Sequence, residues 1–223
     1  MVFLFHTPLS PFAIPNIIIN MNLDTEPCRV GGLALTQEAL DFCGFVTGSR
    51  LVDVGCGFGA TVRYLRAAGF NAYGIDCDMT NMEKAEPYCR LGESSALPFE
   101  AGSLDGLFFE CSLSQMDSCH NVLAEARRVL KDEGKLAISD LYFRSGGQGG
   151  LLPNAGEWKK IITEAGFVVL LFEDKSDDLA EFAAQLLWQH GRAGIEKLCG
   201  CDMEELKAGR CGYFLLIAQK RVG

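Results

Sequence analysis

The chain has 223 residues, of which 29 are acidic and 20 are basic, for a net charge of −9, and this length fits one large α/β domain with its own core. The acidic balance excludes the basic surface that a phosphate backbone requires, so nucleic acid is not an expected partner. Ten cysteines without a regular framework or a signal peptide predict reduced thiols in the cytoplasm rather than a disulfide-bonded secreted domain.

The first 20 residues are apolar, but they contain three prolines and lack a basic n-region. We therefore expect neither a signal peptide nor a membrane span there, and no membrane partner. The interpretation is an N-terminal arm or extension at 1–20, followed by a single domain at 21–223.

The segment from Met21 to Ala34 is predicted to be loop, because Pro27 and the pair Gly31-Gly32 disfavour regular structure. Thr36 is then predicted to cap a short helix that ends near Phe42.

Residues 51–60 combine an apolar run, one carboxylate and three alternating glycines. The pattern predicts a buried strand over 51–54, a tight turn, and a helix from Ala60 that ends at Gly69. Glycine at such spacings lets the backbone turn sharply and lets a ligand approach main-chain N–H groups. We predict a cofactor-binding loop whose residues include Gly55, Cys56, Gly57 and Gly59.

Two classes of cofactor fit this loop, because Gly55, Gly57 and Ala60 also satisfy the dinucleotide fingerprint. Asp53 favours the other class, since its carboxylate would repel a pyrophosphate and attract a cation. The D-x-G-x-G-x-G form resembles motif I of the class I S-adenosylmethionine (AdoMet) dependent methyltransferases, whose cofactor carries an ammonium and a sulfonium. The resemblance implies that Asp53 and the loop bind AdoMet. It also implies that the segment before the motif, with Thr36, forms a lid over the methionine end.

Residues 71–76 form the next predicted strand, with Asp76 at its carboxyl end. Ligands of open parallel sheets bind at that edge, and a carboxylate there can accept both hydroxyl hydrogens of a ribose. Asp76 is therefore the predicted ribose ligand, with Cys77 beside it in the cofactor site.

Residues 90–99 are predicted to form a short strand and a turn, and they resemble the G-D-A-x-x-L-P-F segment of methyltransferases like those of quinone biosynthesis. The resemblance implies that Glu93 lies by the adenine amino group and that the backbone N–H of Ser94 meets the ring. Glu93 is longer than the aspartate of the family pattern, so the direct contact stays open.

Residues 103–110 form a further predicted strand, whose exit at 111–115 we expect to be the methyl-transfer site. The resemblance implies that the backbone there holds the methionyl ammonium. Glu110 is predicted to pair with that ammonium, to bind a cationic acceptor or to act as a base. The segment lacks the N-P-P-Y signature, which disfavours methylation of amide or base nitrogens.

The remaining elements follow from their hydrophobic periodicity. They are a helix over 118–130, a strand over 135–140, a glycine-rich flap at 146–150, a helix over 154–166, a strand over 167–172, a helix over 176–189 and a strand over 213–218. The R-V-L-K-x-x-G-K-L form of residues 128–136 resembles the same connection across the family, so the motifs span 50–143. The resemblance implies a Rossmann-like α/β fold, with a seven-stranded sheet, helices on both faces and the last strand antiparallel.

Methyl transfer from a sulfonium is an in-line displacement that alignment and the exclusion of water can catalyse. Besides Glu110, the candidates for a catalytic role are Asp140 and His120. No metal site is expected, because the C-x-C at 199–201 lacks zinc spacing and a histidine partner. We therefore predict methyl transfer from AdoMet to a small-molecule acceptor by a monomer or homodimer.

Two alternatives stay open. In the first, Cys111 or Cys119 joins Cys199, Cys201 or Cys211 to hold a thiophilic substrate, as three thiolates do in arsenite methyltransferases. In the second, the domain binds AdoMet without transferring its methyl group.

Overall fold

The computed structural model describes residues 29–83, 85–144, 152–199 and 211–222. The predicted arm at 1–20 and the predicted flap at 146–150 lie outside these residues.

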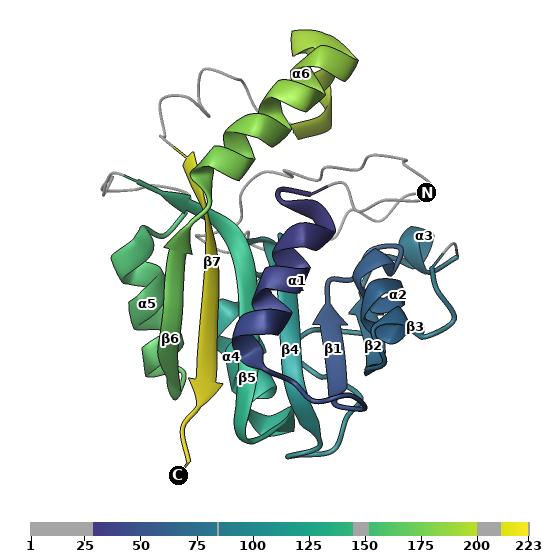
Figure 1. The fold of residues 1–223 in the computed structure, drawn as a ribbon, viewed down its shortest axis with the longest axis vertical. Coiled ribbons are helices and arrows are strands. Elements are labelled where there is room, and N and C mark those ends of the chain that lie inside the picture. Colours follow the sequence, from purple (N-terminus) through teal and green to yellow (C-terminus); the bar gives the residue numbers. More distant parts are fainter. Residues whose placement is uncertain (1–28, 84, 145–151, 200–210, 223) are drawn as a thin grey trace, which may run out of the picture.

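A single seven-stranded sheet runs through the described part of the chain, in the order β3-β2-β1-β4-β5-β7-β6 (Figure 1). The strands are β1 (Arg50–Val54), β2 (Asn71–Asp76), β3 (Cys89–Leu91), β4 (Leu104–Glu110), β5 (Leu130–Phe143), β6 (Phe167–Asp174) and β7 (Cys211–Lys220). The pairs among β1 to β5 are parallel, whereas β7 runs antiparallel to both β5 and β6. The predicted seven-stranded sheet with an antiparallel last strand is confirmed.

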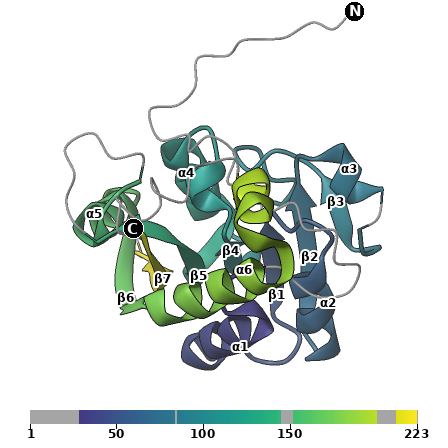
Figure 2. The same ribbon diagram turned by 90° about the horizontal axis from the view of Figure 1, so that it is seen from above.

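Helices cover both faces of this sheet, as predicted. They are α1 (Gly32–Cys43), α2 (Ala60–Ala67), α3 (Met79–Met82), α4 (Cys119–Val129), α5 (Ala155–Glu164) and α6 (Ser176–Cys199), with a 3₁₀ turn η1 at Leu113–Gln115. Figure 2 shows α1, α2 and α6 on one side of the strands and α4 and α5 on the other. The sheet is thus the middle layer of three.

The central strand β4 supplies side chains to both faces, because successive residues of a strand point in opposite directions. Leu107 and Phe109 belong to the apolar core under α4 and α5, and Phe108 to the core under α1 and α2. All three side chains are fully buried. This is why the strand is an almost continuous apolar run in the sequence.

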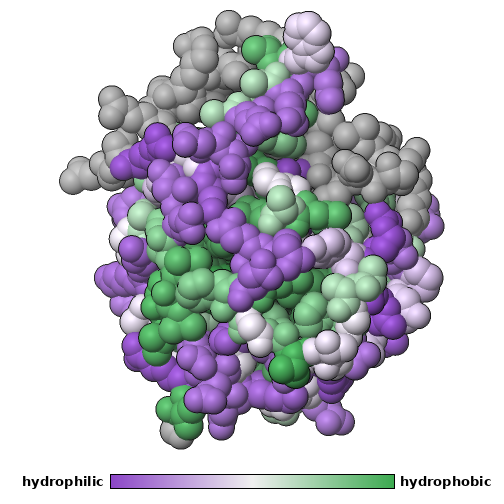
Figure 3. Space-filling model, viewed as in Figure 1, coloured by the Kyte–Doolittle hydropathy of each residue, from purple (hydrophilic) through white to green (hydrophobic). Residues whose placement is uncertain are grey.

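The helix α6 rises past the carboxyl edge of the sheet, above α1 (Figure 1). The predicted helix end near residue 189 is confirmed as a break, because α6 consists of two helical segments that meet at a kink at Gly191, whose φ of 65° and ψ of 175° are not helical. On the face seen in Figure 3, apolar residues gather over β6 and β7, where Val168 and Leu170 are 43% and 41% exposed. The helix therefore stands over the edge of the sheet and leaves part of this face open.

The start of α1 differs from the prediction. Thr36 was expected to cap the helix after a loop containing Gly31 and Gly32, but the helix begins at Gly32, with Gly31 at φ 71° as its cap. A Cβ at Gly31 would stand 2.8 Å from Leu35 Cβ. The glycine pair therefore gives the tight left-handed entry that starts the helix one turn earlier. Thr36 lies inside the helix and is fully buried.

Gly106 lies inside β4, where a glycine normally weakens a strand. The aromatic ring of Phe45 explains its presence, because a Cβ at Gly106 would stand 2.3 Å from Phe45 Cζ. Phe45 in turn packs on Phe108, with ring centroids 6.3 Å apart. The missing side chain makes room for the segment that follows α1.

We expect Gly106→Ala to lower the free energy of unfolding by about 1–3 kcal/mol through overpacking. Phe45→Leu in the same chain should recover part of that loss, because the shorter side chain leaves room for the new methyl group. Urea unfolding of the wild-type chain, both single variants and the double variant gives the coupling energy. Additive effects of the two substitutions would contradict the steric explanation.

Candidate active site

The residues predicted to bind the cofactor come together where β1, β2 and β4 end. These parallel strands lie side by side, so Asp53 in β1 pairs in register with Gly74 of β2 and Phe108 of β4. Asp76 and Glu110 are the last residues of β2 and β4. The carboxyl edge of the sheet thus brings together three acidic side chains that the sequence separates.

The glycine loop wraps over the end of β2. Gly57 N donates to Asp76 Oδ2 at 2.8 Å, and Asp78 N donates to Asp76 Oδ1 at the same distance. Gly55, Gly57 and Gly59 all have positive φ, at 82°, 53° and 84°. A Cβ at Gly55 would also stand 2.5 Å from Ser112 Cβ. The loop therefore needs glycine both for its dihedrals and for the close approach of the segment after β4.

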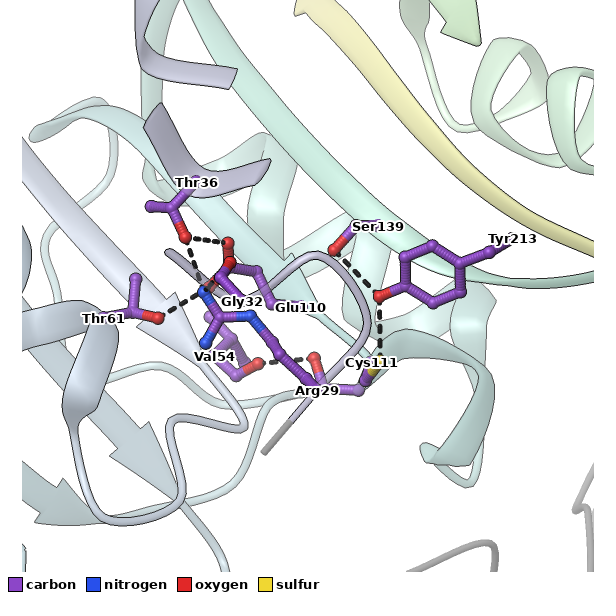
Figure 4. Close-up of polar contacts among 10 residues, drawn as sticks. Arg29, Gly32, Thr36, Val54, Thr61, Glu110, Cys111, Ser139 and Tyr213 are labelled. Atoms are coloured by element: carbon purple, nitrogen blue, oxygen red, sulfur yellow. Dashed lines mark hydrogen bonds and ion pairs between the residues drawn. The ribbon is translucent and has the colours of Figure 1, made fainter. Parts of the chain in front are cut away.

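Glu110 is enclosed by three side chains (Figure 4). Arg29 Nη2 lies 2.7 Å from Glu110 Oε2, while the hydroxyls of Thr36 and Thr61 donate to its two oxygens at 2.8 and 2.6 Å. The side chains of Arg29 and Glu110 are only 11% and 6% exposed. These contacts tie α1, and Arg29 three residues ahead of it, to the end of β4 and to α2.

Asp53 is 3% exposed and lies close enough to Glu110 and Arg29 for both charges to act on it. Burial raises the pKa of Asp53 well above 3.8, the Glu110 carboxylate raises it further, and Arg29 acts in the opposite direction. Burial alone would lower the pKa of Arg29, but the carboxylates of Glu110 and Asp53 more than offset it and raise it. We call Arg29, Asp53 and Glu110 the buried charge cluster. Its two carboxylates face one guanidinium.

Two polar atoms of the buried charge cluster have no hydrogen-bond partner. Within the described residues the buried side-chain atoms of this kind are Arg29 Nε, Asp53 Oδ1 and Ser103 Oγ. Such groups are rare because burial without a partner costs free energy, and each calls for an explanation. In the buried charge cluster, Arg29 Nε is a donor on a cation and Asp53 Oδ1 is an acceptor on a carboxyl group.

The exit of β4 turns through Cys111, which has a φ of 54° that residues other than glycine seldom adopt. Its Sγ lies 2.8 Å from Tyr213 Oη, and that hydroxyl donates to Ser139 Oγ at 3.2 Å (Figure 4). Cys111 N also donates to Ser139 O at 2.8 Å. Strands β5 and β7 therefore hold the turn in which we predict methyl transfer.

Other predicted residues occupy less central places. Asp140 accepts hydrogen bonds from Ser114 N at 2.8 Å and Ser114 Oγ at 2.6 Å, so it anchors η1. Burial raises the pKa of Asp140 although these hydrogen bonds act against it. His120 lies exposed in the first turn of α4.

Cys77 and Glu93 lie beyond Asp76, and both side chains are exposed, while Ser94 is half-buried. Burial, Asp76 and then Glu93 raise the pKa of Cys77, which places the Glu93 carboxylate near the end of β2. This position fits the predicted side of the cofactor site.

Burial also bears on the thiophilic alternative. It raises the pKa of Cys111 to about 12 and that of Cys119 to about 11, with Asp140 adding to both. A metal or metalloid held by these cysteines would have to displace both thiol protons. Among the described residues, no group of three or more histidine, cysteine or acidic side chains could hold a metal ion. The side chain of Cys199, and Cys201 as a whole, lie outside what the structure describes.

Comparisons with known proteins also point to a methyltransferase. A family model described as a methyltransferase domain matches residues 52–138. The O-methyltransferase rstn1 of Aspergillus nomiae is 29% identical over 168 residues, which cover 64% of this chain and 75% of that protein. The chain is a class I AdoMet-dependent methyltransferase.

Two solved structures are similar to the methyltransferase chain. The [4+2]-cyclase SpnF superimposes with a TM-score of 0.68 and 26% identity, over 85% of this chain and 81% of that one. Phosphoethanolamine N-methyltransferase 2 of Haemonchus contortus, in complex with S-adenosyl-L-methionine, gives a TM-score of 0.70 over 87% of this chain and 54% of that one. Its identity is 18%, so this likeness concerns the fold alone. None of the helices in the described parts of the methyltransferase is both long and apolar enough to cross a membrane.

Arg29 and Thr61 are the residues of this site that the sequence analysis missed, and Thr36 was given a different role. Arg29 was counted as part of a loop, because it stands outside any periodic pattern. Thr61 follows the glycine loop in what the sequence marks only as helix. The nearest signal in the sequence is the position of Arg29 just ahead of the glycine pair.

We expect Asp53→Asn to raise the free energy of unfolding of the ligand-free methyltransferase by about 1–2 kcal/mol at about pH 8.5. A carboxyl whose pKa is raised on folding stabilises the native state at low pH, and this contribution is lost as the pH rises through the raised value. The asparagine has no such loss, so its advantage should shrink towards about pH 5. Urea unfolding of both chains at the two pH values measures this difference. A gain that did not depend on pH would show that ionisation of the Asp53 carboxyl is not the cause of the stability difference.

Proposed function

We propose that this methyltransferase binds AdoMet with the amino-acid end at the buried charge cluster and the ribose at Asp76, and that it methylates a small molecule at the exit of β4. The observation that carries the proposal is the pair of unpartnered atoms, Asp53 Oδ1 and Arg29 Nε. The proposal also places the catalytic unit in a single domain at 21–223.

The amino-acid end of AdoMet is a zwitterion, with an ammonium and a carboxylate on one carbon. Asp53 Oδ1 can accept a hydrogen bond from the ammonium, and Arg29 Nε can donate one to the carboxylate. The ammonium would also balance the second carboxylate of the cluster, since Arg29 alone faces both Asp53 and Glu110. A ligand with both charges therefore satisfies both atoms, whereas a simple cation or anion would satisfy one.

The ribose site depends on Asp76. Its two oxygens already accept hydrogen bonds from Gly57 N and Asp78 N. A carboxylate has about four acceptor positions, so these bonds orient the side chain and leave positions for two ribose hydroxyls. The proposal keeps Gly55, Cys56, Gly57 and Gly59 as the backbone cradle and puts Cys77, Glu93 and Ser94 beside the adenine.

The bound cofactor would supply a methyl group on a sulfonium, which a nucleophile displaces in line. The contribution of the chain is alignment and the exclusion of water. Thr36 and Arg29 join α1 to Glu110, which makes α1 a fixed lid on the methionine side. Because the oxygens of Glu110 are already engaged, we assign it to holding the cofactor rather than to removing a proton. Asp140 supports the transfer site through η1, and His120 stays a weaker candidate for a base.

A second function is favoured by one observation, the similarity to the [4+2]-cyclase SpnF at 26% identity. A chain of this type would hold the cofactor and reshape a bound small molecule without methylating it. The two functions differ in the mass of the product, because only methyl transfer adds a carbon.

We further propose a cytoplasmic location and a monomer or homodimer. The seven cysteines described are free thiols, which fits a reducing compartment.

Three ligands separate the two halves of the cofactor site: AdoMet, S-adenosylhomocysteine and 5′-methylthioadenosine, which lacks the amino-acid end. We expect Arg29→Lys to weaken binding of the first two at least tenfold, because lysine cannot reproduce the fork of guanidinium donors, and to leave the third unchanged. Asp76→Ala should weaken all three by about 1–3 kcal/mol through lost charge-assisted hydrogen bonds. Calorimetry measures each affinity.

The matched controls are Arg144→Lys and Asp132→Ala, which change the same residue types in exposed ion pairs. Both should bind all three ligands like the wild-type chain. Equal weakening of 5′-methylthioadenosine by Arg29→Lys would mean that Arg29 acts only through the fold of the lid. Unchanged affinities in Asp76→Ala would refute our placement of the ribose.

The activity itself is tested by incubating methyl-labelled AdoMet and the chain with a fractionated small-molecule extract. We expect label in one fraction with the wild-type chain and little with Asp76→Ala. Mass spectrometry of that fraction identifies the acceptor. Consumption of a small molecule to give an isomer without label would instead support the cyclase function.

A further inference from the structure

Two cysteines meet beneath the glycine loop. Cys56 belongs to the loop after β1, and Cys89 begins the edge strand β3, on the other side of β2. Gly74 of β2 lies between them and pairs in register with Cys89. A Cβ at Gly74 would stand 2.6 Å from Cys56 Sγ and 2.7 Å from Cys89 Sγ, closer than real Cβ contacts allow. The absence of a side chain at Gly74 thus lets both sulfurs occupy one space.

Cys56 Sγ donates to Gly57 O at 3.7 Å. The two neighbouring thiols also act on each other, and this interaction, the largest influence on both groups, raises the pKa of Cys56 and lowers that of Cys89. Cys56 is 8% exposed and Cys89 is half-buried. Cys89 is therefore the sulfur that solvent reaches and the one whose thiolate the neighbour favours.

We propose that Cys56 and Cys89 are a reversible oxidation site, at which a peroxide converts the two thiols into a disulfide. In the first step the Cys89 sulfur attacks one oxygen of hydrogen peroxide, which gives a sulfenic acid and one water. In the second step the Cys56 sulfur attacks the sulfenic sulfur, and the S–O bond breaks to release the second water. A dithiol reductant reverses the change.

The disulfide would act on the cofactor site through the loop. Cys56 and Gly57 are neighbours, and Gly57 N holds Asp76 Oδ2. The sulfur of Cys89 also lies 2.6 Å from where a Cβ of Gly59 would stand. The loop therefore contains one sulfur of the pair, at Cys56, and packs on the other near Gly59. Drawing Cys56 towards the edge strand would shift the backbone donors of the loop. This consequence rests on the proposed AdoMet site, whereas formation of the disulfide does not.

The disulfide is detected by peptide mapping of the full chain after treatment with hydrogen peroxide and alkylation of the remaining thiols. Trypsin releases Cys56 in residues 51–63 and Cys89 in residues 85–90. We expect these two peptides to be joined at low peroxide, with a mass two hydrogens below their sum, and to separate after dithiothreitol. Oxidation of other cysteines while this pair stayed reduced would overturn the proposal, whether or not the chain binds AdoMet.

The effect on the site is measured by calorimetry with AdoMet on the same samples. We expect oxidation to weaken binding by the wild-type chain at least tenfold and dithiothreitol to restore it, a comparison that needs no variant. Cys89→Ala should bind AdoMet equally well before and after peroxide, while Cys211→Ser, a change of another half-buried cysteine, should lose affinity like the wild-type chain. Equal loss in Cys89→Ala, or a complete disulfide with no loss of affinity, would contradict control of the site by this pair.

Discussion

The site depends on the ion pair between Arg29 and Glu110, which is buried at the junction of three elements. Glu110 ends β4, Thr36 comes from α1 and Thr61 from α2, and their hydroxyls complete the coordination of the carboxylate. A buried carboxylate with one partner would be unstable, so the hydroxyls and the guanidinium are needed together. The same contacts fix where the lid stands over the sheet.

This arrangement places a cost on the ligand-free chain. Asp53 is a third buried ionisable group without a full set of partners, and burial and the Glu110 carboxylate raise its pKa because the site tolerates a second negative charge poorly. Residues of this kind are kept where function needs them, since stability alone would favour an uncharged side chain. In the proposed binding mode, the ammonium group of the ligand would offset this cost. We therefore regard the unpartnered atoms as a property of the binding site rather than as a defect of packing.

Glycine gives the site its shape in more than one way. In the loop, Gly55, Gly57 and Gly59 have positive φ angles, and at Gly55 the segment after β4 comes too close for any side chain. At Gly74 the same lack of a side chain admits two sulfurs. The glycine loop is therefore in contact with a pair of cysteine thiols that can be oxidised. This proximity is the physical basis of the coupling that we propose between thiol oxidation and cofactor binding.

The sequence by itself determined the layers of the fold, because its apolar strands, helical periodicity and capping residues are local signals. The strand at 51–54, the helix that starts at Asn154, and the carboxyl-end position of Asp76 were all predicted and found. Only the tertiary structure decided what those side chains contact.

Arg29 and Glu110 are far apart in the chain, as are Cys56 and Cys89, and no local pattern predicts which buried groups meet. The start of α1 also escaped prediction, because a left-handed glycine entry competes with the usual threonine cap, and the packing of Leu35 and Thr36 decides between them. Periodicity sets which face of an element is buried. The partners on that face are set by how the elements pack around the sheet.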